Sequence, residues 1–380
     1  MRRVAVAGVG LTGVGEHWER SLADLYVEAA QRAFDDAGTD EIDALYVSNM
    51  GSAVLQRQLH LGAMMADALG KRGIASFSVE AASAGGGVAF HEGVRAVASG
   101  LCDCVLVGGV EKMSDALPEE VAMTISMAED QEYVAYTGVT NYGLCALLQR
   151  LYMERFGARA DEVAMLAVRG HEHAEGCSHA QYPFKISVDR VLASPMEADP
   201  VHSLECSGIG DGAAAVLLKP AEEAGEGVEV ASTAVASDVF HLTERPNLLT
   251  FDAVRLAADK AYKAAGVCTD DVDVLEVHDD TTITGVISIE DLGFVEKGKG
   301  AAFVAEGNTA RGGRLPTNTF GGLKARGNPL GATGLYQIAE VALQLGWRAG
   351  KCQVPEAKVG MAQSLGGLGS TCAVAILRRT

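Results

Sequence analysis

The chain has 380 residues, of which 48% are hydrophobic and 45 are glycine, and its formal net charge is −19. A chain of this length exceeds one compact core, so we expect a glycine-rich α/β protein of two or more lobes. The excess of 50 acidic over 31 basic residues argues against a nucleic-acid or anionic-membrane surface, but it leaves room for a local basic pocket that binds a phosphate group.

The ends and cysteines of the chain indicate its compartment. The apolar run 4–9 is too short for a signal-peptide core and is typical of a first strand. No apolar run approaches the roughly 20 residues that a membrane helix needs. The eight cysteines are scattered without a C-x-x-C motif, which disfavours a zinc ribbon or other metal site and predicts reduced thiols in a cytoplasmic protein.

Strands and helices alternate through the first part of the chain. We expect strands at 4–9, 42–48, 74–79 and 103–109, and helices at 21–37, 55–69 and from Ser83 to Ser99. The first helix ends at Gly38, and the strand 74–79 is predicted to be buried. This alternation predicts a mixed, mostly parallel sheet flanked by helices.

The segment 78–87, SVEAASAGGG, is the centre of the pattern. A strand, a tight turn of small residues and a helix place Ser83 at a helix N-terminus, where free backbone N–H groups favour negative charge. An α/β fold presents a nucleophile on such an elbow. The alternative is a packing turn in which Ser83 merely caps the helix.

Residues 115–200 differ in composition from both sides. They hold five methionines, polar helices expected at 129–156 and 160–175, and the turn 181–184, and we interpret them as an insertion that covers the site. Its residues Met123, Met127 and 133–142 are candidates for the wall of a hydrophobic acyl or aromatic pocket, with core filling as the alternative. A strand at 211–218 then returns to the first sheet.

The second half repeats the first. Residues 257–278 match 29–48 with a two-residue insertion, and an offset of about 230 residues is too long for a solenoid. We therefore predict two copies of one α/β half, with a strand, glycine turn and helix near 315–345 and last strands at 358–363 and 371–377. The predicted domains are 1–114 with 201–222, the loop domain 115–200, and 223–380.

Three segments of the second half are expected to meet Ser83. His278 ends a strand in the segment 276–280, and strand C-terminal ends line the ligand crevice of open α/β sheets. The segments 321–334 and 363–369 are glycine turns. Singly, each could be a structural histidine or a packing turn, but four such segments at equivalent turns of a duplicated fold favour a site.

With these motifs, the chain resembles the thiolase superfamily over essentially its whole length, and most of all the archaeal and sterol-carrier-type thiolases. The motifs are SVEAASAGG at 78–86, SGIGDGAAAVLL at 207–218, EVHD at 276–279, SIEDLG at 288–293, GGLKARGNPLGATG at 321–334 and QSLGGLGST at 363–371. The resemblance implies a thiolase fold, with two βαβαβ-type halves in a five-layer αβαβα core and an inserted loop domain. It also implies acyl-CoA substrates, coenzyme A as substrate or product with no permanent cofactor, a homodimer or tetramer, and a small zinc-ribbon/OB-fold partner subunit.

The sequence departs from that family at the reacting positions. Ser83 stands where these thiolases have the acylated cysteine, Asn328 where they have the GHP histidine, and Gln363 or Ser364 where they have the C-terminal acid/base. Serine has no accessible anion and needs a base, and asparagine can donate to an oxyanion but cannot take a proton. His278, which is unchanged, is then the only group able to activate Ser83.

The resemblance implies the following roles. Ser83 holds the nucleophile position, His278 and Asn328 bind the thioester oxygen, and backbone N–H groups at Ser83 and around Leu365 and Gly366 form a second oxyanion site. Lys324 and Arg326 are the first candidates for the CoA phosphates, with structural ion pairing as the alternative.

Three explanations of Ser83 stay open. It can be an engineered substitute for cysteine that traps an acyl-CoA in a Claisen-type enzyme. It can belong to a retro-aldolase without a covalent thioester, in which His278, Tyr336, Asp279 or Asp280 acts as base. It can also mark a catalytically silent CoA-binding subunit. We expect carbon–carbon bond chemistry beside a thioester, because the glycine turns and His278 are retained.

Overall fold

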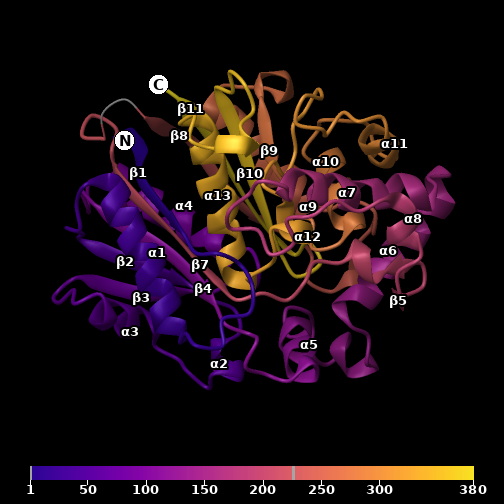
Figure 1. The fold of residues 1–380 in the computed structure, drawn as a ribbon, viewed down its shortest axis with the longest axis horizontal. Helices are drawn as coiled ribbons and strands as arrows, with labels where there is room; N and C mark the ends of the chain where they lie inside the picture. The colour runs from indigo at the N-terminus through magenta and orange to yellow at the C-terminus, as the bar shows by residue number, and fades with distance from the viewer. Residues whose placement is uncertain (1, 225–226) are drawn as a thin grey trace.

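A computed structural model of the chain describes residues 2–224 and 227–380, which fold around one mixed sheet (Figure 1). Its nine strands lie in the order β3-β2-β4-β7-β1-β8-β11-β10-β9, and a small hairpin, β5 (Met196–Ala198) with β6 (Val201–His202), lies apart from it. The two halves of the chain meet where β1 pairs with β8 at the middle of the sheet.

The first half follows the predicted order of elements, with two corrections. Its elements are β1 (Val4–Leu11), α1 (Leu22–Ala37), β2 (Ala44–Ser48), α2 (Ser52–Leu55), α3 (Leu61–Ala68), β3 (Ala75–Val79), α4 (Gly85–Ser99), β4 (Val105–Glu111) and β7 (Gly212–Pro220). The single helix predicted at 55–69 is wrong, because Arg57 and His60 adopt positive φ angles that a helix does not contain. The strand predicted as buried is an edge strand, and its Phe77 is 45% exposed.

The second half repeats this arrangement. Its elements are β8 (Val228–Ser237), α9 (Asp252–Ala265), β9 (Val274–Glu276), α10 (Thr282–Asp291), α11 (Gly300–Ala305), α12 (Gly322–Ala325), α13 (Thr333–Leu345), β10 (Val359–Gly366) and β11 (Thr371–Arg379). The parallel pair β9–β10 corresponds to β2–β4, and the antiparallel pair β10–β11 corresponds to β4–β7. The duplication that the sequence predicts is therefore a duplication of strand order.

The sheet is mixed, but the prediction that it is mostly parallel is wrong. The pairs β2–β3, β2–β4 and β9–β10 are parallel, whereas β1–β7, β1–β8, β4–β7, β8–β11 and β10–β11 are antiparallel. Neighbouring strands run parallel here only where helices connect them. The chain instead passes from β4 to the antiparallel β7 through the insertion, and from β10 to the antiparallel β11 through a short turn.

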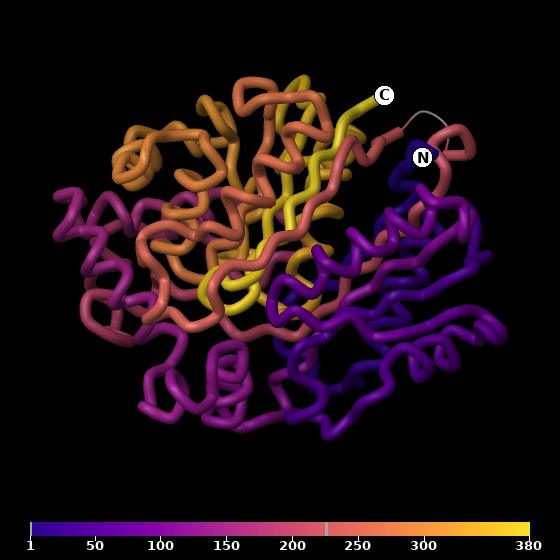
Figure 2. The backbone as a smooth tube through the Cα atoms, turned by 180° about the vertical axis from the view of Figure 1, so that it is seen from behind, coloured from indigo at the N-terminus to yellow at the C-terminus, as the bar shows by residue number. Residues whose placement is uncertain are grey.

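The layers are those of the predicted αβαβα core. Helices α4 and α13 lie between the two halves of the sheet, and one apolar cluster joins Phe90 of α4 and Leu335 of α13 to strand residues of both halves, such as Val107 and Leu377. Helix α1 covers the outer face of the first half and α9 that of the second. Figure 2 shows the two halves side by side, seen from behind.

The insertion between β4 and β7 lies along the second half. It contains α5 (Pro118–Ser126), α6 (Asn141–Phe156), α7 (Ala160–Ala174) and α8 (Val188–Leu192). The helix predicted from residue 129 begins only at Asn141, because Gly138 has a φ of 83° and Thr140 caps α6 by accepting from the N–H of Gly143. The boundaries predicted for the three domains stay predictions.

Candidate active site

The elbow before α4 presents Ser83 without using its hydroxyl as a cap. The preceding residue, Ala82, has a φ of 49°, a strained backbone for a residue with a side chain. Helix α4 begins at Gly85 with Ala84 as its N-cap, and no side chain caps it. The alternative in which Ser83 is a helix cap is therefore wrong, and its hydroxyl is available at the turn.

Glycines bring the second half against this elbow. A Cβ atom added to Gly86 would lie 2.9 Å from the backbone nitrogen of Leu335, and one added to Gly334 would lie 2.6 Å from the backbone nitrogen of Gly87. Real Cβ atoms do not approach a backbone atom so closely, so α4 and α13 cross where neither helix has a side chain. The glycine turns of the two halves thus position the loop that carries Asn328.

Ser83, His278 and Asn328 line one cavity, as the sequence predicts for residues that work together. Its volume of about 30 Å³ is enough for roughly two water-sized groups. The other lining residues are Met50, Ile125, Ala128, Asn141, Tyr142, Ser207, Asp280, Leu330 and Gly367. The cavity is therefore built from both halves and from the insertion.

His278 follows the end of β9 and is held as a neutral imidazole. Its backbone N–H donates to Gln363 Oε1 at 2.9 Å, while its Nδ1 is buried without a partner in the described chain. Burial lowers the pKa of His278 to about 4, with Asp280 opposing the shift and Arg326 adding to it. At neutral pH the ring can donate one N–H to an oxygen, and it is a weak base.

Asn328 shares the wall with His278. Its Nδ2 donates to Ser207 Oγ at 3.2 Å, and its Oδ1 is buried without a partner among the described residues. A rotation of the amide would let the Ser207 hydroxyl donate to Oδ1 and would turn the N–H₂ group toward the cavity. In either orientation one polar atom of Asn328 is left for a ligand.

The Ser83 hydroxyl has no base beside it. Within the described chain its one hydrogen-bond contact is Met50 Sδ at 3.8 Å. A serine nucleophile needs a base within hydrogen-bond reach of its hydroxyl, and this contact supplies none. In this conformation Ser83 is positioned but not activated.

The other predicted oxyanion and acid/base residues lie next to the cavity rather than in it. Leu365 is buried in the core of the second half, and Gly366 packs against the elbow, where an added Cβ would lie 2.5 Å from the Ala81 oxygen. Gln363 holds the backbone of His278, and the following Ser364 lies against Gly87. The second oxyanion site stays a prediction, since the residue of this turn that lines the cavity is Gly367.

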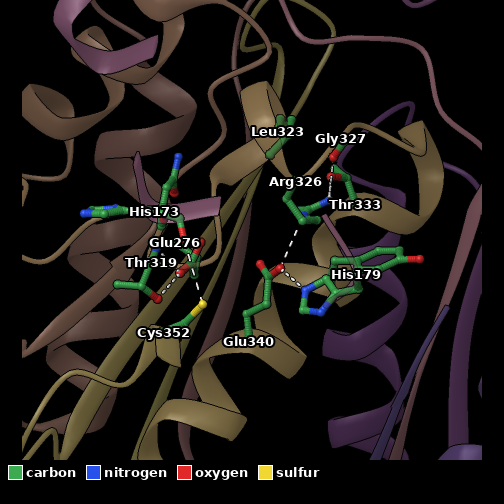
Figure 3. Close-up of polar contacts among 12 residues, drawn as sticks. His173, His179, Glu276, Thr319, Leu323, Arg326, Gly327, Thr333, Glu340 and Cys352 are labelled. Carbon is green, nitrogen blue, oxygen red and sulfur yellow. Dashed lines mark hydrogen bonds and ion pairs between the residues drawn. The ribbon is translucent and has the colours of Figure 1, made fainter. Parts of the chain in front are cut away.

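Arg326 and Lys324, the candidates for binding the CoA phosphates, are both buried. Arg326 has no exposed surface, and its Nε forms an ion pair with Glu340 Oε1 at 3.1 Å, the oxygen that also contacts His179 at 2.8 Å (Figure 3). Lys324 is 4% exposed, with its Nζ 5.7 Å from the centre of the Tyr182 ring, and burial lowers its pKa to about 8. The alternative of a structural role fits Arg326.

Two of the candidate bases for a retro-aldolase are held elsewhere. The hydroxyl of Tyr336 donates to the Thr12 oxygen at 3.0 Å in the buried core, so it cannot act as base in the cavity. Asp279 is buried, and its Oδ1 accepts from the N–H of Leu323 at 2.7 Å. The next residue, Asp280, lines the cavity with His278.

Sequence reasoning missed several wall residues. Met123 and Met127 are 53% and 50% exposed, while Ile125 and Ala128 from the same segment line the cavity. Of the region 133–142, Asn141 and Tyr142 line it. Ser207 lines the cavity and opens the motif 207–218, which carried the family resemblance but gave Ser207 no role in the site. The spacing of α5 was the one available signal, because Ile125 lies two residues, about half a helical turn, from both exposed methionines and therefore faces the other way.

Glu111 ties both halves together behind the cavity. Its carboxylate accepts from the backbone N–H groups of Met50 and Gly51 in the first half and of Gly331 in the second, at 2.9 to 3.0 Å, and from Asn49 Nδ2 at 2.8 Å. Burial raises its pKa to about 7, and these donors oppose the shift. The clamp fixes the cavity residues Met50 and Leu330 on either side of the joint.

Comparisons with known proteins identify the class to which this site belongs. The family pattern "Thiolase, N-terminal domain" matches residues 4–222, and "Thiolase C-terminal domain-like" matches residues 234–379. The chain belongs to the thiolase family.

Similar proteins are consistent with this family assignment. The chain is 45% identical to the "Acetyl-CoA acetyltransferase" of Methanothermobacter thermautotrophicus over 100% of both chains. It is 32% identical to human "Sterol carrier protein 2" over 96% of this chain and 70% of that protein. Among solved structures, the "Ltp2-ChsH2(DUF35) aldolase" superposes with a TM-score of 0.85 at 22% identity, covering 99% of this chain and 98% of that one, which shows the shared fold.

These findings confirm the predicted resemblance to archaeal and sterol-carrier-type thiolases and the thiolase fold. At the level of the family they also confirm an enzyme of the acyltransferase class. None of the described helices is both long and apolar enough to span a bilayer. In the described parts of the chain, no three His, Cys, Asp or Glu side chains group as metal ligands do.

Proposed function

We propose that the protein makes or breaks a carbon–carbon bond beside the thioester carbonyl of an acyl-CoA, in the manner of a thiolase, with Ser83 in the nucleophile position. The observation that carries the proposal is the cavity in which His278 Nδ1 and Asn328 Oδ1 are buried without partners in the described chain, next to Ser83. Buried polar atoms without partners are costly unless a ligand satisfies them.

We infer that His278 and Asn328 bind the thioester oxygen. A neutral imidazole N–H and the amide N–H₂ of Asn328 both donate to an oxygen, and both gain strength as that oxygen becomes an enolate. The backbone of His278 is held by Gln363, so the ring is positioned before the substrate binds. Coenzyme A is then substrate or product, and no resident cofactor takes part.

In the thiolase-type route, Ser83 Oγ attacks the C3 carbonyl of a 3-ketoacyl-CoA and its proton passes to His278. The C2–C3 bond breaks, the acetyl-CoA enolate takes that proton, and the acyl group stays on Ser83 until the thiol of a second CoA removes it. This route requires Ser83 to move within reach of His278, because its hydroxyl now contacts Met50 Sδ.

A retro-aldol route is the second candidate, and the absence of a base at the Ser83 hydroxyl in the described chain favours it. A base in the cavity removes the C3 hydroxyl proton of a 3-hydroxyacyl-CoA. The C2–C3 bond breaks to release an aldehyde or ketone, and the enolate held by His278 and Asn328 is protonated at C2. Asp280, which lines the cavity, is a base for this step. The third candidate is a silent CoA-binding subunit.

The test is the intact mass of the protein and of a Ser83→Cys variant after incubation with acetyl-CoA and with 3-ketoacyl-CoAs. We expect the cysteine variant to gain an acyl mass and release CoA, because a thiol is partly ionised near neutral pH and needs no strong base. If neither protein is acylated while the serine protein cleaves a 3-hydroxyacyl-CoA without free CoA, the retro-aldol route replaces the thiolase route. If neither protein is acylated or cleaves any thioester, the catalytic proposal fails.

The assembly follows from the same family. We propose a cytoplasmic homodimer or tetramer, supported by the edge strand β3, whose outer side is free of a neighbouring strand in the described chain. A small zinc-ribbon/OB-fold partner subunit is also proposed, supported by the DUF35 component that the name of the similar aldolase structure includes. Light scattering of the purified chain measures the first, and co-purification from the source cells tests the second.

A further inference from the structure

One carboxylate lines the cavity beside Ser83, and a second lies behind its wall. Asp280 lines it directly. Glu129 stands behind two lining residues, because it follows Ala128 and because a Cβ atom on Gly367 would lie 2.8 Å from its Oε1. Asp280 is also one of the charges that raise the pKa of Glu129, after the larger effect of burial, so the two carboxylates are near enough to repel each other.

Asp280 is held firmly in this position. Its Oδ1 accepts from the N–H of Thr281 at 2.8 Å and from Thr284 Oγ1 at 2.5 Å, and its Oδ2 accepts from Asn141 Nδ2 at 3.0 Å. These donors come from the start of α10 and from α6, so the insertion and the second half both fix the carboxylate. A carboxylate oxygen has two lone-pair directions, and Oδ2 keeps one of them for a ligand.

Three polar atoms in this region of the described chain are left without partners. They are Asn328 Oδ1 and Glu129 Oε2, together with His278 Nδ1, which accepts or donates according to its tautomer. Their residues are 6%, 4% and 3% exposed. Glu129 Oε2 can only accept when it is ionised, whereas Asn328 and His278 can turn an N–H toward the thioester oxygen, so the carboxylates are the groups that favour a further donor on the ligand.

The cavity wall offers no positive charge in return. Within the described parts of the chain, none of its lining residues is a lysine or an arginine. The arginine whose charge opposes the rise in the pKa of Glu129 is Arg245, which is not a lining residue and whose Nη1 donates to the Leu368 oxygen at 2.6 Å. An anion entering the cavity would therefore meet like charge, whereas a cation or a neutral donor would meet acceptors.

We propose that Asp280 makes this cavity selective for acyl-CoA thioesters whose acyl group carries an amine or hydroxyl donor, and selective against acyl groups that end in a carboxylate. The inference rests on the proposed function, because it takes an acyl-CoA as the ligand, and it adds the class of acyl group. The carboxylate of Asp280 receives the donor, and Asn328 and His278 keep their contacts to the thioester oxygen.

The test is the affinity of the unmodified chain for four CoA thioesters by isothermal titration calorimetry at one salt concentration. β-Alanyl-CoA carries an ammonium group, 3-hydroxypropionyl-CoA a hydroxyl, butyryl-CoA a methyl group and succinyl-CoA a carboxylate. We expect β-alanyl-CoA to bind about tenfold or more tighter than butyryl-CoA and succinyl-CoA about tenfold or more weaker, since hydrogen bonds to charged groups are worth this much. The affinity of 3-hydroxypropionyl-CoA shows whether a neutral donor is sufficient or whether a positive charge is needed.

The matched variant is Asp280→Asn, which keeps the size of the side chain and an oxygen for Thr281 and Thr284. We expect it to bring β-alanyl-CoA and butyryl-CoA to within about threefold of each other, whereas Asp270→Asn, an exposed aspartate outside the cavity, leaves the ratio unchanged. The four-ligand series on the unmodified chain stands by itself if Asp280→Asn does not fold.

Two results would overturn the inference. If β-alanyl-CoA binds no tighter than butyryl-CoA, or if the preference survives in Asp280→Asn, Asp280 does not select the acyl group, although the proposed function stands. If neither the four thioesters nor free CoA bind, the proposed function fails and the inference falls with it.

Discussion

The two halves of this molecule have the same strand order and different chemistry. In the first half, the turn before α4 presents a single hydroxyl, Ser83, on a strained backbone. In the second half, the end of β9 and the turn before α13 supply the histidine, the carboxylate and the amide of the cavity, which are His278, Asp280 and Asn328. The first half therefore supplies the nucleophile position, and the second half supplies the groups that can bind an oxygen or transfer a proton.

This difference explains why neither half is a site by itself. Among the described residues, the Ser83 hydroxyl contacts Met50 Sδ and no base of its own half, while His278 and Asp280 belong to the second half. The joint between the halves, made by glycines of α4 and α13 and by the Glu111 clamp, brings the two sets together. The substitutions below alter this joint or the residues of the second half.

The largest effect is expected when the second half loses its proton-bearing group. His278→Gln removes a ring that donates to the thioester oxygen, and loss of one such donor costs about 10²–10³-fold in kcat. Turnover of the substrate that the unmodified chain or the Ser83→Cys variant accepts is the measurement. His91→Gln, a change on α4 outside the cavity, is the control and should keep its activity. Equal activity in the two variants would show that His278 does not touch the reacting oxygen.

The next effect concerns the joint itself. Gly334→Ala places a methyl group 2.6 Å from the backbone nitrogen of Gly87 in the other half, and we expect a loss of about 1–3 kcal/mol in the free energy of unfolding, as overpacking costs. Chemical denaturation measures it. Gly312→Ala, whose added methyl group meets no atom within 4 Å, should change stability by less than about 0.5 kcal/mol. A Gly334→Ala protein as stable as that control would mean that α4 and α13 do not cross at the glycines.

The last prediction sharpens the comparison by testing how the insertion is fixed to the second half. His173 of α7 is buried and its Nδ1 contacts the Thr317 oxygen at 3.0 Å. Burial lowers its pKa from 6.5 to about 4. As the pH falls from 6.5 to 4, the unfolded chain therefore binds a proton that the folded chain does not, and stability is lost.

Over this window the unmodified chain should lose up to about 3 kcal/mol more than a His173→Gln variant, which follows from 1.36 kcal/mol for each unit of pKa shift. Urea denaturation of both proteins at several pH values measures the difference between their slopes. Above pH 6.5 the two slopes should agree. Parallel slopes between pH 4 and 6.5 would mean that His173 titrates alike in the folded and unfolded chains.

The sequence by itself determined the elements that depend on local pattern. Apolar periodicity and glycine caps placed α1, α7 and most strands, and the repeat of 29–48 in 257–278 predicted the duplicated halves. His278 was recognised because a polar residue directly after a buried strand lies at a known edge of the sheet. The family resemblance followed from motifs of this kind, which are contiguous in the chain.

Only the tertiary structure decided where side chains of the irregular turns point. Arg326 and Asn328 are two residues apart in one glycine turn, yet the first is buried against Glu340 and the second lines the cavity. In such a turn the direction of a side chain does not follow from its spacing in the sequence. The positive φ angles at Gly321, Gly322 and Gly327 change the direction of the backbone at each glycine. Which side of α5 faces the cavity, that of Met123 or that of Ile125, likewise depends on segments far away in the sequence that pack against it. The same holds for the exposure of β3.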